Sequence, residues 1–266
     1  MKQIRMFVKR SSLIATAGAA VIFLIVMVPD TTAPVNAAKP GNCQNVPSAA
    51  QLRQLLIAAQ NVNKPIGGLF EGTRMWAAVV NRDGEVCAYT TSTSDPTQVW
   101  PGSQAIAKSK AYTANAFSLD DFALSTARLY TFTQPGHSLW SLGQSNLFNP
   151  NFLAAPTGES GGKNQFVGGL IFFGGGVPLY RSGKIIGGLG VSGDTSCADH
   201  EIAKRVRDLA GLNPPLPGGA LADDIVYSPP DPPSVFAHPV CPTTYRNGIK
   251  IGDEAPATYP LVPAGP

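Results

Sequence analysis

Residues 173–207 read FGGGVPLYRSGKIIGGLGVSGDTSCADHEIAKRVR and contain the signals for three consecutive elements. Two apolar runs, Val177–Tyr180 and Ile185–Val191, flank the polar residues Arg181–Lys184, which is the pattern of a β-hairpin. Residues Ser192–Ser196 then offer several side chains able to cap a helix. Apolar residues recur after them at helical spacing, at Ile202, Ala203, Val206, Leu209 and Ala210. The stretch therefore predicts strand, turn, strand, small-residue loop and helix.

A similar order of elements is expected upstream. Met75–Val80 and Glu85–Thr90 flank Asp83-Gly84, a dipeptide that supplies the positive φ of a hairpin turn. Ser48 and Gln51 have the spacing of a capping box, which predicts a helix to about Asn61. Two more helices are expected, one capped by Ser103 and containing Lys110, the other from Phe122 to Tyr130.

Four motifs occur here in the order found in one known family. They are Asp83-Gly84, Lys110-Ala111, Gly174-Gly175-Gly176 with Pro178, and Gly190-Val191-Ser192-Gly193. The chain resembles the GlcG/HbpS-like haem-binding family over Ser48–Gly211. The resemblance implies an α+β fold with an antiparallel sheet built from two hairpins and covered by helices, profilin-like in architecture. It also implies non-covalent binding of haem or a related tetrapyrrole, for storage, scavenging or redox sensing.

The N-terminus has the three parts of a secretory signal peptide. Four basic residues precede the apolar stretch Leu13–Val28, and Val35-Asn36-Ala37 is a small-residue cleavage site. We expect residues 1–37 to be removed on export to the periplasm or medium, which leaves no membrane span. An uncleaved anchor is the alternative, because the apolar stretch is long for a signal peptide.

The net charge of +3 belongs to this N-terminal segment. Removing residues 1–37 takes away four basic residues and one acidic residue, which leaves 16 of each. A neutral chain with no basic run gives no electrostatic reason to bind nucleic acid.

Four cysteines lie in the exported part, and an oxidising compartment favours disulfides. Three pairings are possible. We favour Cys43–Cys87 with Cys197–Cys241, because each bond would tie an extension to the core beside it.

Two further regions flank or interrupt the expected domain, residues 38–211. Thr133–Lys163 is long and poor in periodicity, which indicates a lid or a homo-oligomer contact through Leu139, Trp140, Leu147 and Phe148. Residues 212–266 hold 13 of the 24 prolines, so we expect an extension packed on the domain rather than a second domain.

Residues Gly188–Gly193 fit the GxGxxG pattern of dinucleotide sites. No second parallel strand with a ribose-binding acid follows, so the glycines are interpreted as a means of close packing. The N–H groups of Gly193–Cys197 can still hold an anion at a helix start. An alternative function is therefore an enzyme or accessory factor acting on a small organic acid held at Ser192–Ser196. A structural oligomer without a ligand is a third possibility, and an enzyme is less expected than a binding protein.

A haem site needs an axial donor, and no CxxCH motif for covalent attachment occurs. His200 is the candidate axial ligand, but it shares a helix face with Lys204 and Arg207, so a solvent-exposed or interface role is the alternative. His137, in the long loop, is the second candidate, and its alternative is ordinary loop polarity. Other expected site residues are Lys110, which would pair with a propionate, and Gly175, Gly176, Ser192 and Gly193. Tyr112, Tyr180 and Met75 are further possible donors.

Overall fold

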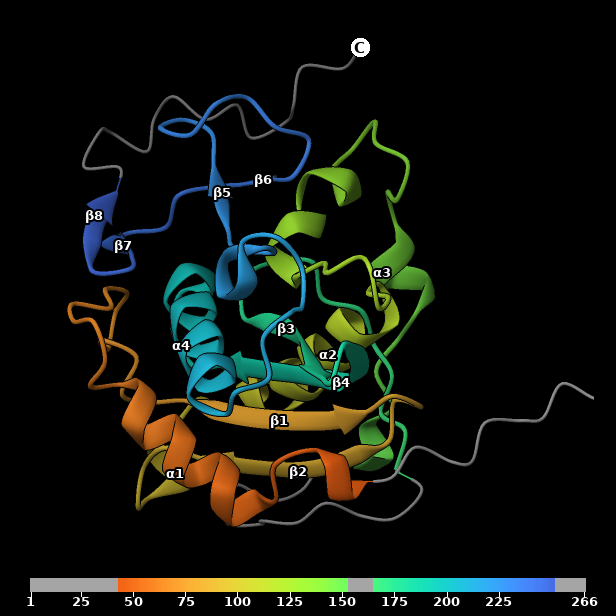
Figure 1. The fold of residues 1–266 in the computed structure, drawn as a ribbon, viewed down its shortest axis with the longest axis vertical. Helices are drawn as coiled ribbons and strands as arrows, with labels where there is room; N and C mark the ends of the chain where they lie inside the picture. The colour runs from red at the N-terminus through yellow and green to blue at the C-terminus, as the bar shows by residue number, and fades with distance from the viewer. Residues whose placement is uncertain (1–42, 153–164, 252–266) are drawn as a thin grey trace, which may run out of the picture. The chain divides into compact units, whose positions relative to one another are not determined.

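The structure, a computed structural model, describes residues 43–152 and 165–251 (Figure 1). Residues 1–42 with the expected signal peptide, residues 153–164 of the expected long loop and the last fifteen residues lie outside the described residues.

Two hairpins form one antiparallel sheet of four strands in the order β2-β1-β4-β3. The first hairpin consists of β1 (Trp76–Asn81) and β2 (Val86–Thr91), and the second of β3 (Gly176–Arg181) and β4 (Lys184–Ser192). The hairpins join through β1 and β4, with Trp76 opposite Ser192. The expected α+β fold with an antiparallel sheet is confirmed.

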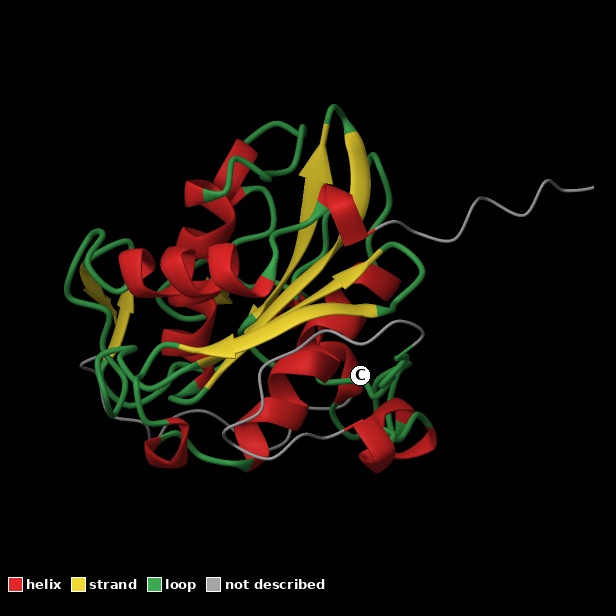
Figure 2. Cartoon of the chain, turned by 90° about the horizontal axis from the view of Figure 1, so that it is seen from below, coloured by secondary structure: helices red, strands yellow, loops and turns green. Residues whose placement is uncertain are grey.

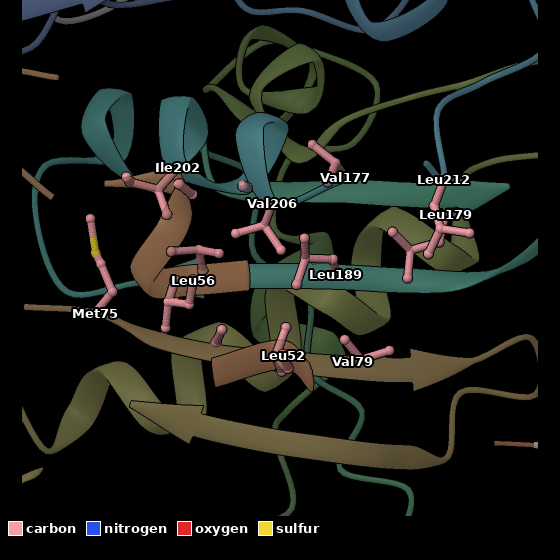
Figure 3. Packing of buried hydrophobic residues seen from close by; sticks show 14 of the residues in the cluster. Leu52, Leu56, Met75, Val79, Val177, Leu179, Leu189, Ile202, Val206 and Leu212 are labelled. Carbon is pink, nitrogen blue, oxygen red and sulfur yellow. The ribbon is translucent and has the colours of Figure 1, made fainter. Parts of the chain in front are cut away.

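Helices cover both faces of the sheet, as Figure 2 shows. Helices α1 (Ala49–Ala59) and α4 (Ser196–Leu209) pack on one face, where Leu52, Leu56, Ile202 and Val206 meet Val79 and Leu189 (Figure 3). Helix α2 (Gly102–Ala116) packs on the other face, against Trp76, Ala78 and Val80. Strand β1 is therefore buried on both sides, which explains the continuous apolar run from Trp76 to Val80.

The glycines of β4 allow α2 to approach closely. A Cβ atom on Gly188 would lie 2.1 Å from the Ala111 carbonyl oxygen, and one on Gly190 would lie 2.0 Å from that of Ala107. Both distances are too short for any side chain, so close packing accounts for these two positions of the GxGxxG pattern.

Local capping signals are mostly where the sequence places them. Ser48 and Gln51 form the expected capping box at α1, and Thr195 caps α4. Helix α2 instead begins at Gly102, and no side chain caps it. The expected helix from Phe122 to Tyr130 is wrong.

Short 3-10 turns replace that helix, at Thr126–Leu129 (η3) and Thr131–Thr133 (η4). The Ser118 hydroxyl accepts a hydrogen bond from the Leu124 N–H and lies 3.2 Å from the Leu124 carbonyl oxygen, so a side chain competes with helical pairing. The remaining short helices are η1 (Cys43–Asn45), η2 (Pro96–Gln98), α3 (Leu142–Ser145), η5 (Pro150–Phe152) and η6 (Gly219–Leu221).

Residues 212–251, here called the C-terminal extension, contact α4 through charged groups and a disulfide. The extension contains β5 (Val226–Tyr227) paired with β6 (Ala237–His238), and β7 (Thr244–Arg246) paired with β8 (Ile249–Ile251). The Cys43–Cys87 and Cys197–Cys241 disulfides both form, as we favoured. Within the described ranges, no helix combines the length and hydropathy needed to cross a membrane.

Candidate functional site

Most of the expected site residues meet where the middle of α2, the start of α4 and the loop Gly174–Gly176 come together. Lys110 places its Nζ 2.7 Å from Asp199 Oδ2 and 3.1 Å from the Val191 carbonyl oxygen. Both charged side chains are buried. The sequence analysis did not select Asp199, because it lies 89 residues from Lys110 in the chain. The only signal for it was its position in the first turn of a helix.

Burial is the largest influence on the protonation of this pair. It raises the pKa of Asp199 to about 6, although the Lys110 charge acts in the opposite direction. Burial also lowers the pKa of Lys110. Asp199 Oδ1 accepts a further hydrogen bond from the Asp194 N–H, at 2.9 Å. Lys110 therefore has an internal carboxylate partner and would reach a propionate only if this pair opened.

The glycine loop is closely packed against the same residues. A Cβ atom on Gly175 would lie 2.6 Å from Lys110 Nζ, and one on Gly176 would lie 2.6 Å from the Lys110 carbonyl oxygen. The Gly174 N–H donates to His238 Nε2 at 3.1 Å, and the Gly176 N–H donates to Thr126 Oγ1 at 2.8 Å. Of the two glycines expected in the site, Gly176 therefore has its amide hydrogen-bonded within the protein.

The N–H groups at the start of α4 also find hydrogen-bond acceptors within the protein. Ser192 is buried in the sheet, opposite Trp76. The Asp194 N–H donates to Asp199, and the Cys197 N–H donates to Cys241 Sγ at 3.2 Å. The Ala198 N–H donates to the capping Thr195 hydroxyl. An anion held at this helix start would have to displace these groups, so the geometry does not favour the organic-acid alternative.

His200 is fully buried beneath the C-terminal extension. Its Nε2 lies 3.4 Å from Asp224 Oδ1, but neither ring nitrogen forms a hydrogen bond within the described parts of the chain. The helix face that it shares with Lys204 and Arg207 is covered, because Lys204 pairs with Asp224 at 2.8 Å and Arg207 with Asp223 at 2.6 Å. The alternative of a solvent-exposed histidine is therefore wrong.

The other two histidines lie in different settings. His238, which the sequence did not single out, is buried and accepts the Gly174 hydrogen bond. Its position three residues before Cys241 was the available signal, since that disulfide brings it to α4. His137 lies half-buried in a turn before α3, and its ring bonds to no described residue. The structure does not place it in contact with His200.

An open groove lies elsewhere, between α1 and the C-terminal end of α4. It has a volume of about 530 Å³. Its apolar wall includes Leu55, Ala58 and Leu212, and Arg181 stands at the end of β3. The other lining residues are Gln44, Val46, Pro47, Gln51, Gln54, Leu209 and Ala210. None of the expected site residues lines it.

The groove fits part of a haem, but not its iron. Apolar side chains suit a porphyrin face, and a guanidinium suits a propionate. The residues lining the groove include no imidazole, thiol, thioether or phenol, so they supply none of the usual axial donors. Two of the further donors considered are not available either, because Met75 lies in the core and the Tyr180 hydroxyl donates to the Leu119 carbonyl oxygen.

Comparison with known proteins identifies the family. The family described as "Haem degrading protein HbpS-like" matches residues 49–208. Among solved structures, a complex of PduOC with haem is 22% identical with a TM-score of 0.44, over 62% of this chain and 93% of that one. OrfY from Klebsiella pneumoniae is 23% identical with a TM-score of 0.42, over 61% and 88%.

A double mutant of HbpS from Streptomyces reticuli is also similar. It is 20% identical with a TM-score of 0.37, over 60% of this chain and 82% of that one. No curated protein matched the chain. Since the family match spans more than half of the sequence, from α1 to the end of α4, the chain belongs to the HbpS-like family.

Proposed function

We propose that this is an exported protein that binds haem or a related tetrapyrrole non-covalently, in the groove between α1 and α4. Membership of the HbpS-like family is the observation that carries the proposal. The groove, at about 530 Å³, lies within the usual range for small-molecule sites of about 300–1,000 Å³. Reversible binding of this kind would serve storage, scavenging or redox sensing.

Two kinds of side chain in the groove would recognise haem. Leu55, Ala58 and Leu212 would pack against the face of the macrocycle, and Arg181 would bind a propionate. If haem binds there, its iron would supply the redox chemistry. Because the lining residues lack the usual axial donors, the groove should hold iron-free protoporphyrin about as well as hemin.

Hemin titration of the exported protein, whose first residue we expect to be Ala38, tests the proposal. A saturable, shifted Soret band is expected. Ala58→Trp should block the groove and weaken binding by about tenfold or more, since it fills space that the ligand needs. Ile57→Trp is the matched control, because Ile57 is the exposed neighbour on the same helix and does not line the groove.

Two further variants separate the groove from His200. Arg181→Gln should weaken binding, whereas Lys184→Gln, on the same hairpin, should not. His200→Ala should leave the Soret band unchanged. If His200→Ala shifts the band while Ala58→Trp has no effect, the ligand lies under the C-terminal extension and the groove is the wrong site. If the parent protein shows no saturable band, the haem proposal is wrong.

A further inference from the structure

A second, smaller pocket lies beside Gly193 and has two aromatic walls. Its volume is about 220 Å³. Phe70 comes from the loop before β1, and Trp100 from the segment before α2. Their rings meet edge to face, with centroids 5.5 Å apart and planes at 74°. Trp100 is 48% exposed although it is a large aromatic residue, so part of its ring is open to a ligand.

Arg74 gives this pocket a positive charge. Its guanidinium carbon lies 4.9 Å from the centre of the Phe70 ring. Within residues 43–152 and 165–251 the guanidinium has no carboxylate partner and donates no side-chain hydrogen bond, and Arg74 is exposed. A guanidinium stacked on an aromatic ring keeps its planar set of donors for an anion. The pocket therefore combines flat apolar walls with one cationic group that has no counter-ion in the described part of the chain.

Asp194 holds the wall of the pocket in place. Its carboxylate accepts hydrogen bonds from the N–H groups of Leu69 at 2.6 Å, Phe70 at 2.8 Å and Gly72 at 3.3 Å. These bonds join the loop that carries Phe70 to the segment that follows β4. Because the loop is fixed before any ligand arrives, binding would not have to order it. This pre-organisation distinguishes the pocket from a chance contact of exposed rings.

We propose that this pocket binds a small aromatic carboxylate with a single ring. The volume is below the range of about 300–1,000 Å³ typical of drug-sized ligands, which leaves room for one ring and excludes a tetrapyrrole. The ring would stack against Trp100 and Phe70, and the carboxylate would pair with Arg74. This site shares no lining residue with the groove proposed for haem, so it stands independently of that proposal.

Titration with benzoate, followed by the indole N–H resonances in NMR spectra, tests the inference. The chain has three tryptophans, Trp76, Trp100 and Trp140, and a Trp100→Phe variant assigns the relevant signal. Benzoate should shift the Trp100 signal in a saturable manner. Arg74→Gln should weaken benzoate binding by about tenfold or more, the cost of losing a charge-assisted pair. Lys184→Gln removes an equal charge outside both the groove and this pocket, and should not change it.

Two analogues test the separate parts of the recognition. Benzyl alcohol keeps the ring without the charge, and cyclohexanecarboxylate keeps the charge without the flat ring. Both should bind more weakly than benzoate. If benzyl alcohol binds as well as benzoate, or Arg74→Gln has no effect, the carboxylate assignment is wrong. If the Trp100 signal does not respond at all while the parent protein still binds hemin, the pocket is not a ligand site and the haem proposal is unaffected.

Discussion

At the scale of single residues, the buried imidazole of His238 makes folding depend on pH. The pKa of His238 is lowered from 6.5 to about 3, chiefly by burial and to a smaller extent by the nearby His200 and Lys110. The ring stays neutral in the folded protein, so its Nε2 can accept the Gly174 N–H. In the unfolded chain the same ring takes up a proton near pH 6.5.

This difference predicts a loss of stability on acidification. As the pH falls from about 6.5 towards 3, the unfolded state gains a proton that the folded state excludes, so the free energy of unfolding decreases. Between pH 7 and pH 5 the decrease from His238 should be roughly 2 kcal/mol. His238→Gln should lack this slope, whereas His137→Gln should keep it. Urea unfolding at the two pH values measures both.

The titration of Asp199 does not affect the comparison of the parent protein with the two histidine variants. The pKa of Asp199 is raised, so this carboxyl alone favours the folded state as the pH falls through about 6. That contribution has the opposite sign, but it is present in all three proteins. Equal slopes for the parent and His238→Gln would contradict the assignment of a neutral buried imidazole.

At the scale of elements, α4 has the sequence of an amphipathic surface helix, but its polar face is covered as well. Its polar face carries His200, Lys204 and Arg207, which would normally face water. Asp223 and Asp224 of the C-terminal extension pair with the two cations, and Cys241 is bonded to Cys197 in the first turn. These charged side chains can be buried because each is paired, whereas an unpaired charge at the same place would carry a much larger desolvation penalty.

The two disulfides allow the role of this extension to be measured. Each closes a separation of 44 residues, so loop-closure entropy predicts a similar loss of about 4 kcal/mol for each Cys→Ala double variant. Only Cys197→Ala/Cys241→Ala should make residues 212–251 sensitive to protease, because of the two disulfides only that one joins them to α4. Urea unfolding and limited proteolysis are the measurements. The same cleavage pattern in Cys43→Ala/Cys87→Ala would contradict the tether.

At the scale of the whole molecule, the segment from Thr133 to Phe152 presents apolar side chains without a covering element among the described residues. Trp140 is 52% exposed and Leu147 is 78% exposed. We expected Leu139 and Phe148 to be exposed as well, but both are partly buried. Leu139 packs against the cluster that contains Phe172, and Phe148 against the cluster that contains Trp76. The exposed surface of this segment is therefore smaller than the sequence indicated.

We predict that Trp140 and Leu147 form part of a homo-oligomer contact. A Trp140→Ser/Leu147→Ser variant should lower the mass measured by light scattering at micromolar concentration, because these side chains would lose the apolar area that they bury on assembly. Val235→Ser is the control, since Val235 is exposed but lies in the C-terminal extension. A parent protein that is only monomeric would rule out the contact.

The sequence by itself determined the elements whose signals are local. The two hairpins follow from turn residues between apolar runs, and α1 and α4 begin at the side chains that cap them. The disulfide partners could be favoured but not proved, because the argument rested on which core lay beside each extension. The helix expected at 122–130 failed because the Arg128 N–H donates to the Ser125 carbonyl oxygen in a 3-10 turn, while the Leu124 carbonyl oxygen, its helical partner, accepts from the Ser118 hydroxyl.

Only the tertiary structure decided which of the expected site residues are accessible. Lys110 meets Asp199 across 89 residues, and Asp223 and Asp224 reach α4 from a proline-rich segment without periodicity. Such contacts depend on where a segment lies in space, and no spacing in the sequence encodes that. The groove at Arg181 and the pocket at Arg74 were missed for the same reason, because each is built from segments far apart in the chain.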